Sequence, residues 1–339
     1  MNNKIFITGV AGFIGYHLCK RLLSEGNNII GLDNLNPFYD VNLKQARLNN
    51  LYKVNGDFQF FQDDLENIDI IEKIFEEQEP TIVFNLAAQA GVRYSIENPD
   101  VFTKTNILGF NNLLSVCAKY KNIKHLIYAS SSSVYGGNKN LPYSEKSSVD
   151  HPVSIYAATK KANELYAHCF SHLYSIPITG LRFFTVYGPW GRPDMAYFLF
   201  TKSILEDKNI NIFNNGDMYR DFTFIDDIIE SLTRIMNKPP QKNKNFDTKS
   251  PSGHSSWAPH RIFNIGNSKS IKLISFIEEI EKALGKKAKK TFLPMQKGDV
   301  ESTLANTQLL ENWINFKPNT QLDIGLKKFV SWYKDYYFN

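Results

Sequence analysis

The chain has 339 residues, 42% of them hydrophobic and 22% charged, which is close to the average of globular proteins and argues against disorder. No stretch approaches the roughly 20 apolar residues that a membrane-spanning helix needs. The net charge of +5 is modest, and the lysines between residues 282 and 290 fit a solvated helical face. We therefore expect neither a membrane nor a nucleic acid as partner, although a phosphate-bearing small substrate suits a mildly basic protein.

The cysteines give an expectation about the cellular compartment. Cys19, Cys117 and Cys169 lie far apart and show neither the spacing of metal ligands nor a disulfide framework. The N-terminal residues run directly into a strand pattern, without a signal peptide. We expect a protein of the reducing cytoplasm that binds no metal.

The first half of the chain alternates between strand-like and helix-like segments. Strands are expected at residues 4–9, 28–33, 58–62, 81–86, 125–130 and 178–184. Helices are expected at residues 13–24, 67–77, 99–119 and 154–172. This alternation predicts right-handed crossovers and an α/β fold with a doubly wound parallel sheet.

The pattern is looser in the second half. Helices are expected at residues 198–205, 225–237 and 271–284, a strand at 262–266, and a polar surface excursion at 238–259. We therefore expect a Rossmann domain at residues 1–180 and a smaller α/β substrate lobe at 181–339, with some segments returning to the first domain. The active site should lie in the cleft between them.

A glycine-rich turn joins the first strand to the first helix. Gly9, Gly12 and Gly15 permit a tight turn and the close approach of a diphosphate, and Phe13 and Ile14 begin the helix whose N–H groups face it. Asp33 at the end of the second strand can accept both hydroxyls of an adenosine ribose and would repel a 2′-phosphate. The turn therefore predicts NAD as cofactor rather than NADP.

Further cofactor contacts are expected where the next strands end. Near the adenine we place Asn34, Asp64 and Leu65, of which the last two follow the third strand. The small residues at the end of the fourth strand allow the backbone to approach the cofactor. They are Leu86, Ala87, Ala88 and Gln89. Each of these residues, taken alone, could equally be ordinary loop or core sequence.

Tyr156 and Lys160 are the expected acid–base pair. They lie four residues apart and therefore share one face of a helix. A cation one turn away lowers a phenol pKa from about 10. An exposed tyrosine and a solvated lysine are the alternative, but the preceding strand ends in serines, of which Ser131 is the expected partner of the reacting hydroxyl.

These motifs together resemble the extended short-chain dehydrogenase/reductase family along essentially the whole chain. The resemblance also rests on later motifs: Leu181-Arg-Phe-Phe184, Val186-Tyr-Gly-Pro189, Arg220-Asp-Phe222, Asn264-Ile-Gly266 and Gly298-Asp299. Membership implies a tightly held NAD and a nucleoside-diphosphate sugar as substrate. It also implies that Arg220 contacts the diphosphate and that Asp299 holds the nucleotide ribose. For Arg220 the alternative is an ion pair with Asp217 or Asp221.

Within the family the chain looks most like a UDP-glucuronate 4-epimerase. Dehydratases and UDP-glucuronate decarboxylases typically carry Glu where this chain has Ser133. The segment around Thr185 and Arg192 is similar to that of the glucuronate epimerases, and these two side chains could bind a C6 carboxylate. An ion pair with Asp194 is the alternative role of Arg192. Other expected substrate contacts are Arg93, Ser133, Phe213 and Gln296, and Ser133 is also expected among the catalytic residues.

The expected reaction is inversion at C4 through a 4-keto sugar, with Tyr156 moving the hydroxyl proton and Lys160 holding the nicotinamide ribose. Both residues are therefore also expected cofactor contacts. Gln296 and Asn306 depart from the pattern of the glucose epimerases, and the small Thr303 keeps UDP-N-acetylhexosamines open as substrates. The same motifs would also suit a UDP-hexose epimerase, a UDP-glucuronate decarboxylase or a non-catalytic NAD-binding scaffold. The resemblance further implies a homodimer, paired through the helices at 99–119 and 154–172, and a role in polysaccharide synthesis.

Overall fold

The structure is a computed structural model that describes residues 3–296 and 299–338. Its centre is a parallel sheet in the order β10-β6-β5-β4-β1-β2-β3. The strands are β1 (Lys4–Thr8), β2 (Asn28–Leu32), β3 (Phe58–Phe61), β4 (Ile82–Asn85), β5 (His125–Ser131), β6 (Ile178–Phe183) and β10 (His260–Ile265). The expected α/β fold with a doubly wound parallel sheet is confirmed.

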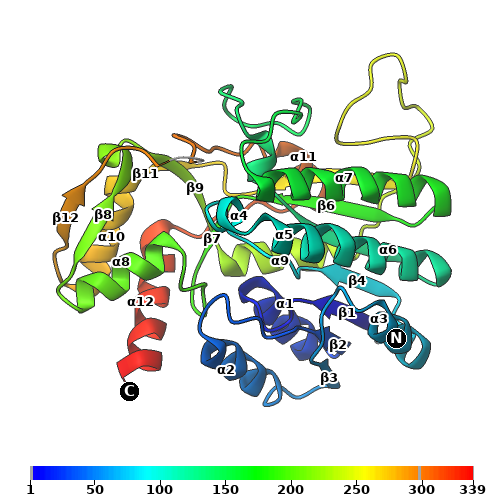
Figure 1. Ribbon diagram of the computed structural model, residues 1–339, viewed down its shortest axis with the longest axis horizontal. Coiled ribbons are helices and arrows are strands. Elements are labelled where there is room, and N and C mark those ends of the chain that lie inside the picture. Colours follow the sequence, from blue (N-terminus) through cyan, green and yellow to red (C-terminus); the bar gives the residue numbers. More distant parts are fainter. Residues whose placement is uncertain (1–2, 297–298, 339) are drawn as a thin grey trace.

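Helices cover both faces of this sheet (Figure 1). The helices are α1 (Phe13–Ser24), α2 (Val41–Leu51), α3 (Ile68–Gln78), α4 (Tyr94–Glu97), α5 (Pro99–Phe102), α6 (Gly109–Lys119), α7 (Ile155–Tyr174) and α9 (Ile225–Met236). In β1, Ile5 and Ile7 pack in the core that includes α1 and α9, whereas Phe6 packs in the core that includes α3 and α6. Because successive side chains of a strand point to opposite faces, a continuous apolar run is buried on both sides.

A second layer of structure lies beyond β6. β7 (Thr185–Tyr187), β9 (Tyr219–Phe224) and β11 (Ser270–Lys272) form one small sheet, and β8 (Asn209–Ile212) pairs with β12 (Lys289–Phe292). The helices of this part are α8 (Ala196–Leu205), α10 (Leu273–Leu284), α11 (Gln308–Ile314) and α12 (Leu322–Phe338). The segment at residues 238–259 has no helix and forms a projecting loop (Figure 1).

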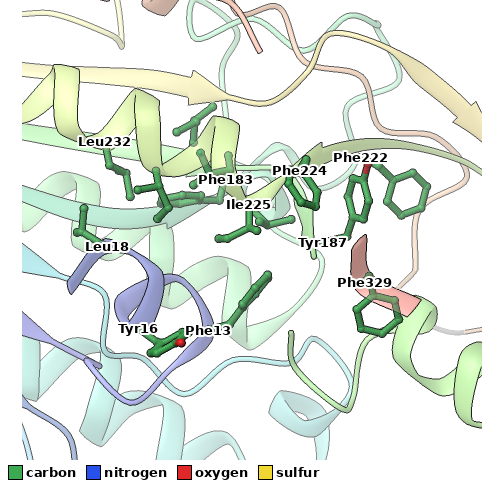
Figure 2. Close-up of a cluster of buried hydrophobic side chains, with 14 of the residues drawn as sticks. Phe13, Tyr16, Leu18, Phe183, Tyr187, Phe222, Phe224, Ile225, Leu232 and Phe329 are labelled. Atoms are coloured by element: carbon green, nitrogen blue, oxygen red, sulfur yellow. The ribbon is translucent and has the colours of Figure 1, made fainter. Parts of the chain in front are cut away.

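One apolar core joins the two parts of the chain. Figure 2 shows Phe13 and Tyr16 from α1 in the same cluster as Tyr187 from β7 and Phe222 from β9. The expected division after residue 180 falls inside β6, and α9 and β10, which come after it, pack with the large sheet. The division into domains therefore stays a proposal, and the returning segments that it allows for are α9 and β10.

Some elements differ from those expected. The single helix expected at residues 99–119 is interrupted by the π-helical segment η1 (Thr103–Leu108) between α5 and α6. The sequence pattern does not predict α2 or α12, nor the short strands β7, β8, β9, β11 and β12. Within residues 3–296 and 299–338, no helix has both the length and the apolar character needed to cross a membrane.

Candidate active site

The glycine turn leaves no room for side chains. Gly9 has a left-handed φ of +73°, and a Cβ atom there would lie 2.7 Å from the backbone nitrogen of Ala87 at the end of β4. A Cβ on Gly15 would lie 2.1 Å from the carbonyl oxygen of Gly9. Gly12 precedes α1 without a side-chain cap, so that the first N–H groups of the helix remain available to an anion. This cradle fits the diphosphate of a dinucleotide.

Asp33 lies next to this turn and is almost fully buried. Its Oδ2 accepts a hydrogen bond from the Ala11 N–H at 3.1 Å, and its Oδ1 accepts one from the Leu35 N–H at 2.9 Å. The Lys44 ammonium is 4.0 Å from Oδ1. The carboxylate is therefore held at the edge of the glycine turn, where a ribose of NAD would be bound.

The expected adenine contacts lie close together. The Asn34 side chain donates to the Asp64 carboxylate at 2.9 Å, and Leu65 is buried beside Gly109 of α6. These residues come from the ends of β2 and β3, which are neighbours in the sheet. Their placement at the carboxyl edge fits the adenosine end of NAD.

The loop after β4 is held by a residue that the sequence pattern does not single out. The backbone N–H of Ala87 donates to the Thr8 hydroxyl at 3.2 Å. Asn106, buried in η1, accepts a hydrogen bond from the Gln89 N–H at 2.8 Å and donates to the Gln89 carbonyl at 3.0 Å. It also donates to the Thr159 hydroxyl of α7 at 3.1 Å. Asn106 thus ties the expected cofactor loop to the helix that carries Tyr156.

Tyr156 and Ser131 are brought together as expected. Tyr156 lies in the first turn of α7, which begins after Ser154, whose hydroxyl accepts from the Ala157 N–H at 3.1 Å. Burial raises the pKa of Tyr156 above its ordinary value, while a hydrogen bond with Ser131 and the charge of Arg192 act to lower it. Tyr156, the predicted proton-transfer residue, thus has a hydroxyl and a guanidinium nearby.

Lys160 differs in part from the expectation. Its ammonium donates to the Ala129 carbonyl at 2.7 Å, and burial lowers its pKa to about 8. The cation that acts to lower the Tyr156 pKa in this structure is Arg192, and the lowering by Lys160 stays a prediction. The lysine side chain extends back to β5 and not along the helix toward the phenol.

A buried ionic network lies beneath these residues. The Arg182 guanidinium donates to both oxygens of the Glu164 carboxylate at 2.8 Å, and both side chains are at most 2% exposed. The Ser130 hydroxyl donates to Glu164 at 2.7 Å, and Arg182 donates to the Tyr135 hydroxyl at 3.1 Å. The network fixes α7 against β5 and β6. Sequence reasoning misses it because the two charges are 18 residues apart.

Arg192 forms the ion pair with Asp194 that is the alternative to its binding a substrate carboxylate. Its Nε and Nη2 donate to the two oxygens of Asp194, at 3.0 and 2.5 Å. Burial by itself lowers the pKa of the guanidinium, but the Asp194 carboxylate outweighs it, with smaller contributions from Tyr39 and Tyr156, and the pKa is raised. Arg192 therefore remains a cation near the reactive tyrosine.

The remaining substrate residues form a second group, and the predicted contact Ser133 lies apart from it, beside Ser131. The Arg93 guanidinium stacks 5.3 Å from the centre of the Phe213 ring and lies 3.9 Å from Asp299. Arg220 donates to Asp299 at 2.8 Å. The Ser133 N–H donates to the Ser131 hydroxyl at 3.1 Å.

The alternative ion pair of Arg220 with Asp217 or Asp221 is wrong. Arg220 pairs with Asp299, whereas Asp221 is buried and accepts hydrogen bonds from the backbone N–H groups of Asn267, Ser268 and Ala305. Burial raises the pKa of Asp221 to about 6. The aspartate next to Arg220 in sequence therefore points into the protein and binds two backbone segments, at residues 267–268 and at Ala305.

Gln296 and Thr185 are the last of the expected substrate contacts. The side-chain oxygen of Gln296 is buried and has no hydrogen-bond partner among residues 3–296 and 299–338. Gly298, which belongs to the Gly-Asp motif, lies outside the described residues. Thr185 begins β7 and is half-buried opposite Phe222 of β9.

Comparison with known proteins identifies relatives along nearly the full length. A model of the NAD dependent epimerase/dehydratase family matches residues 5–266. The chain is 53% identical over 334 residues to protein CapI of Staphylococcus aureus, covering 98% of this chain and 99% of that protein. It is 45% identical over 335 residues to a probable UDP-glucuronate 4-epimerase of Rhizobium meliloti, covering 98% of each.

A solved structure agrees with both the fold and the cofactor. The crystal structure of a UDP-glucuronic acid 4-epimerase from Bacillus cereus, in complex with UDP-glucuronic acid and NAD, is similar with a TM-score of 0.85 and 33% identity. The match covers 98% of this chain and 100% of that chain. The expected family and the expected cofactor, NAD, are therefore confirmed. The chain belongs to the NAD-dependent epimerase/dehydratase family.

Proposed function

We propose that this enzyme interconverts UDP-glucuronate and UDP-galacturonate by inversion at C4. The observation that carries the proposal is the position of Arg192. It lies in the loop that follows β7, and its charge acts to lower the pKa of Tyr156. The relatives named for UDP-glucuronate 4-epimerisation, at 45% and 33% identity, support the same substrate.

The proton chemistry follows from Tyr156 and Ser131. As a phenolate, Tyr156 takes the proton of the sugar 4-hydroxyl, and Ser131 holds that oxygen by a hydrogen bond. When bound, NAD supplies the acceptor and donor of the C4 hydride. The 4-keto sugar then presents its other face, and Tyr156 returns the proton to the 4-oxygen. Both protons and electrons balance, so the sugar is isomerised without net oxidation.

Arg192 and Thr185 are proposed to bind the C6 carboxylate. Arg192 uses Nε and Nη2 for Asp194, and Nη1 has no hydrogen-bond partner within the described ranges of the chain. A guanidinium whose planar N–H groups are aligned by a carboxylate on one side is well placed to bind another anion on the other. The Thr185 hydroxyl would supply a second donor.

Ser133 supports epimerisation over dehydration and decarboxylation. Relatives that catalyse these two reactions typically carry a glutamate at this position, and a serine hydroxyl cannot act as the base that removes the C5 proton in a dehydration. With a neutral side chain at this position, removal and return of the C4 hydride is the simplest chemistry that the site supports. UDP-N-acetylhexosamine stays an alternative substrate because Thr303, although buried, is small.

The nucleotide end of the substrate is proposed to lie over the second group of residues. Arg220 and Arg93 both lie close to Asp299 and would face the diphosphate and ribose. Phe213 lies under the Arg93 guanidinium and offers an aromatic face to the uracil. The buried oxygen of Gln296 is a further candidate contact.

The test is to incubate the enzyme with UDP-glucuronate, without added NAD, and to separate the nucleotide sugars. UDP-galacturonate as product supports the proposal, and its formation without added NAD indicates a retained cofactor. UDP-xylose as the main product would establish the decarboxylase instead, and turnover of UDP-N-acetylglucosamine alone would establish the acetamido substrate. Arg192→Ala should weaken UDP-glucuronate binding or release a UDP-pentose, and unchanged kinetics would contradict the role of Arg192.

A homodimer is proposed through α6 and α7. The exposed side of α7 carries Leu165, Tyr166 and Leu173, which are between 41% and 68% exposed. Such a row of large apolar side chains on one helix is typical of a helix-pairing interface. Light scattering tests this, and Leu165→Glu should shift a dimer to monomers while a monomeric wild type would refute the proposal.

The cytoplasm is the proposed compartment. Cys19, Cys117 and Cys169 are all free, and the first two are buried. Free thiols are stable in a reducing compartment. Fractionation of cells followed by immunodetection would place the protein in the cytosolic fraction, and recovery from a secreted fraction would contradict this.

A further inference from the structure

The Arg47 side chain connects two loops of the candidate active site. It comes from α2 and is fully buried. Its Nη1 donates to the Ala11 carbonyl in the glycine turn at 2.8 Å and to the Tyr39 hydroxyl at 2.7 Å. Its Nη2 donates to the carbonyls of Trp190 and Gly191 at 2.6 and 3.2 Å. One guanidinium thus joins the cofactor turn to the loop that carries Arg192.

This buried cation has no carboxylate partner. Within residues 3–296 and 299–338, no Asp or Glu oxygen forms an ion pair with Arg47, and its Nε has no hydrogen-bond partner. A buried charge without a counter-ion is unfavourable, so its retention needs another reason. Tyr39 offers its ring to two cations, with the Lys44 ammonium 4.9 Å and the Arg47 guanidinium 5.5 Å from the ring centre. Positive charge therefore gathers between the glycine turn and Arg192.

The backbone that Arg47 holds is in an unfavourable conformation. Trp190 has a left-handed φ of +60°, which is rare for a bulky residue. Its ring is fixed against Tyr16, Trp332 and Tyr336, at centre-to-centre distances of 5.5, 5.2 and 5.1 Å. Such a conformation persists when the surroundings determine it, and two hydrogen bonds from Arg47 to this turn do so.

Gly191 completes the turn. A Cβ atom at this position would lie 2.0 Å from the Tyr197 hydroxyl, so the backbone runs directly over α8. Arg192 follows immediately in the chain. The Trp190 and Gly191 carbonyls that Arg47 holds thus lie two residues and one residue before Arg192.

We propose that Arg47 is a positioning residue, which acts through Arg192 to set the preference for a carboxylate-bearing sugar and to keep the carboxylate on the 4-keto intermediate. The proposal rests on the proposed function and names a residue that controls its specificity. Arg47 itself is too deeply buried to touch the sugar, so its effect must pass through the Trp190–Arg192 turn.

The competing reaction is loss of CO₂ from the 4-keto sugar. That intermediate is a β-keto acid, whose C5–carboxylate bond breaks when it lies parallel to the π orbitals of the ketone. The bonding electrons pass to the ketone as an enolate, CO₂ leaves, and a proton is taken up at C5. The products are a UDP-4-ketopentose, CO₂ and a cofactor left reduced. A fixed Arg192 would keep the carboxylate out of that alignment.

The test compares Arg47→Lys and Arg47→Met with the wild-type holoenzyme. Lysine keeps the charge but has one nitrogen in place of the two terminal nitrogens with which Arg47 binds the Ala11 carbonyl and the Trp190 turn. The measured quantities are the dissociation constants of UDP-glucuronate and UDP-xylose, which lacks the carboxylate, and the ratio of epimer to UDP-4-ketopentose. We expect UDP-glucuronate binding to weaken about tenfold in both variants, with UDP-xylose changed less than about twofold. The share of decarboxylated product should rise.

Arg234→Lys is the matched control. Arg234 also donates to a loop carbonyl, that of Asn315 at 3.0 Å, but it lies away from Tyr156 on α9. Arg234→Lys should change neither the ratio of the two dissociation constants nor the ratio of epimer to UDP-4-ketopentose. If Arg47→Met does not fold, the result for Arg47→Lys tests the proposal. Equal losses of affinity for both nucleotide sugars, or unchanged ratios in a folded variant, would overturn the proposal.

A double variant separates this inference from the function on which it rests. If Arg47 acts through Arg192, adding Arg47→Lys to Arg192→Ala should cause no further change. The ratio of the dissociation constants of UDP-glucuronate and UDP-xylose should then be the same in the double variant as in Arg192→Ala alone. Additive losses would show that Arg47 acts by another route. Failure of the wild type to turn over UDP-glucuronate would refute the proposed function instead, whatever the Arg47 variants do.

Discussion

Replacing Arg182 with methionine should cause a large loss of stability. Arg182 makes two hydrogen bonds of 2.8 Å to Glu164, and the two side chains are 1% and 2% exposed. Burial lowers the pKa of Arg182, but Glu164 outweighs burial and raises it above its ordinary value. The variant would leave the Glu164 carboxylate with the Ser130 hydroxyl and with Lys161, whose ammonium is 4.0 Å away.

The size of the effect follows from the uncompensated charge. Removing one partner of a buried ion pair typically costs about 3–5 kcal/mol. The lost hydrogen bond to the Tyr135 hydroxyl, at 3.1 Å, adds about 1 kcal/mol. A second substitution, Glu164→Gln, removes the orphaned charge. We expect the Arg182→Met/Glu164→Gln double variant to regain at least about 2 kcal/mol of the loss.

Urea unfolding followed by fluorescence measures these differences as shifts of the midpoint. The control is Arg21→Met, since Arg21 is 48% exposed and its ion pairs lie at the surface. That variant should lose less than about 1 kcal/mol. If Arg182→Met loses no more than this control, or if the double variant is no more stable than the single one, the buried pair does not hold α7 as described.

Three further predictions concern the turn, the pH profile and a salt bridge. Gly15→Ala should abolish retention of NAD because its Cβ would lie 2.1 Å from Gly9, whereas Gly137→Ala, which meets nothing within 4 Å, should retain it; cofactor released on denaturation is measured. Activity should fall above about pH 8 as Lys160 loses its proton, and Lys160→Arg should lack that decline, since arginine stays protonated. Two lysines outweigh burial and lower the Glu281 pKa from 4.5 to about 2, so its stabilisation is present above pH 4.5 and lost as the pH falls toward 2. Glu281→Gln should therefore cost about 1–3 kcal/mol at pH 7 and little near pH 2, and equal urea midpoints at pH 7 would contradict this.

The sheet and the cofactor turn could be predicted because their signals are local. β1 to β6 are short apolar runs that end within two residues of the expected positions. The turn depends on glycine spacing, which is visible in the sequence and has a direct steric reason. Tyr156 and Ser131 could be placed together because Ser131 ends β5 and Tyr156 lies at the start of the next α-helix, α7.

The residues that support the site could not be predicted in this way. Arg47 and Asn106 lie in helices, and their polar side chains look like those of any solvated helix surface. Their burial is decided by segments far away in sequence, such as the Trp190 turn. The sequence pattern misses α12 because the aromatic side chains of this helix are stabilised by packing on the Trp190 turn, which is far away in sequence. The spacing of Tyr156 and Lys160 on the helix does not predict the Tyr156 pKa, because burial dominates it.

Asp33 has a consequence for attempts to exchange the cofactor. We expect selectivity against a 2′-phosphate to rest on its charge, and an obvious route to NADP would replace it with a small neutral residue. The same carboxylate, however, accepts the Ala11 and Leu35 N–H groups and so links the glycine turn to the loop after β2. A replacement would remove the repulsion and loosen both loops at once. We therefore expect cofactor preference in this enzyme to be coupled to the shape of its phosphate cradle, so that a successful exchange must supply two new acceptors together with the new charge.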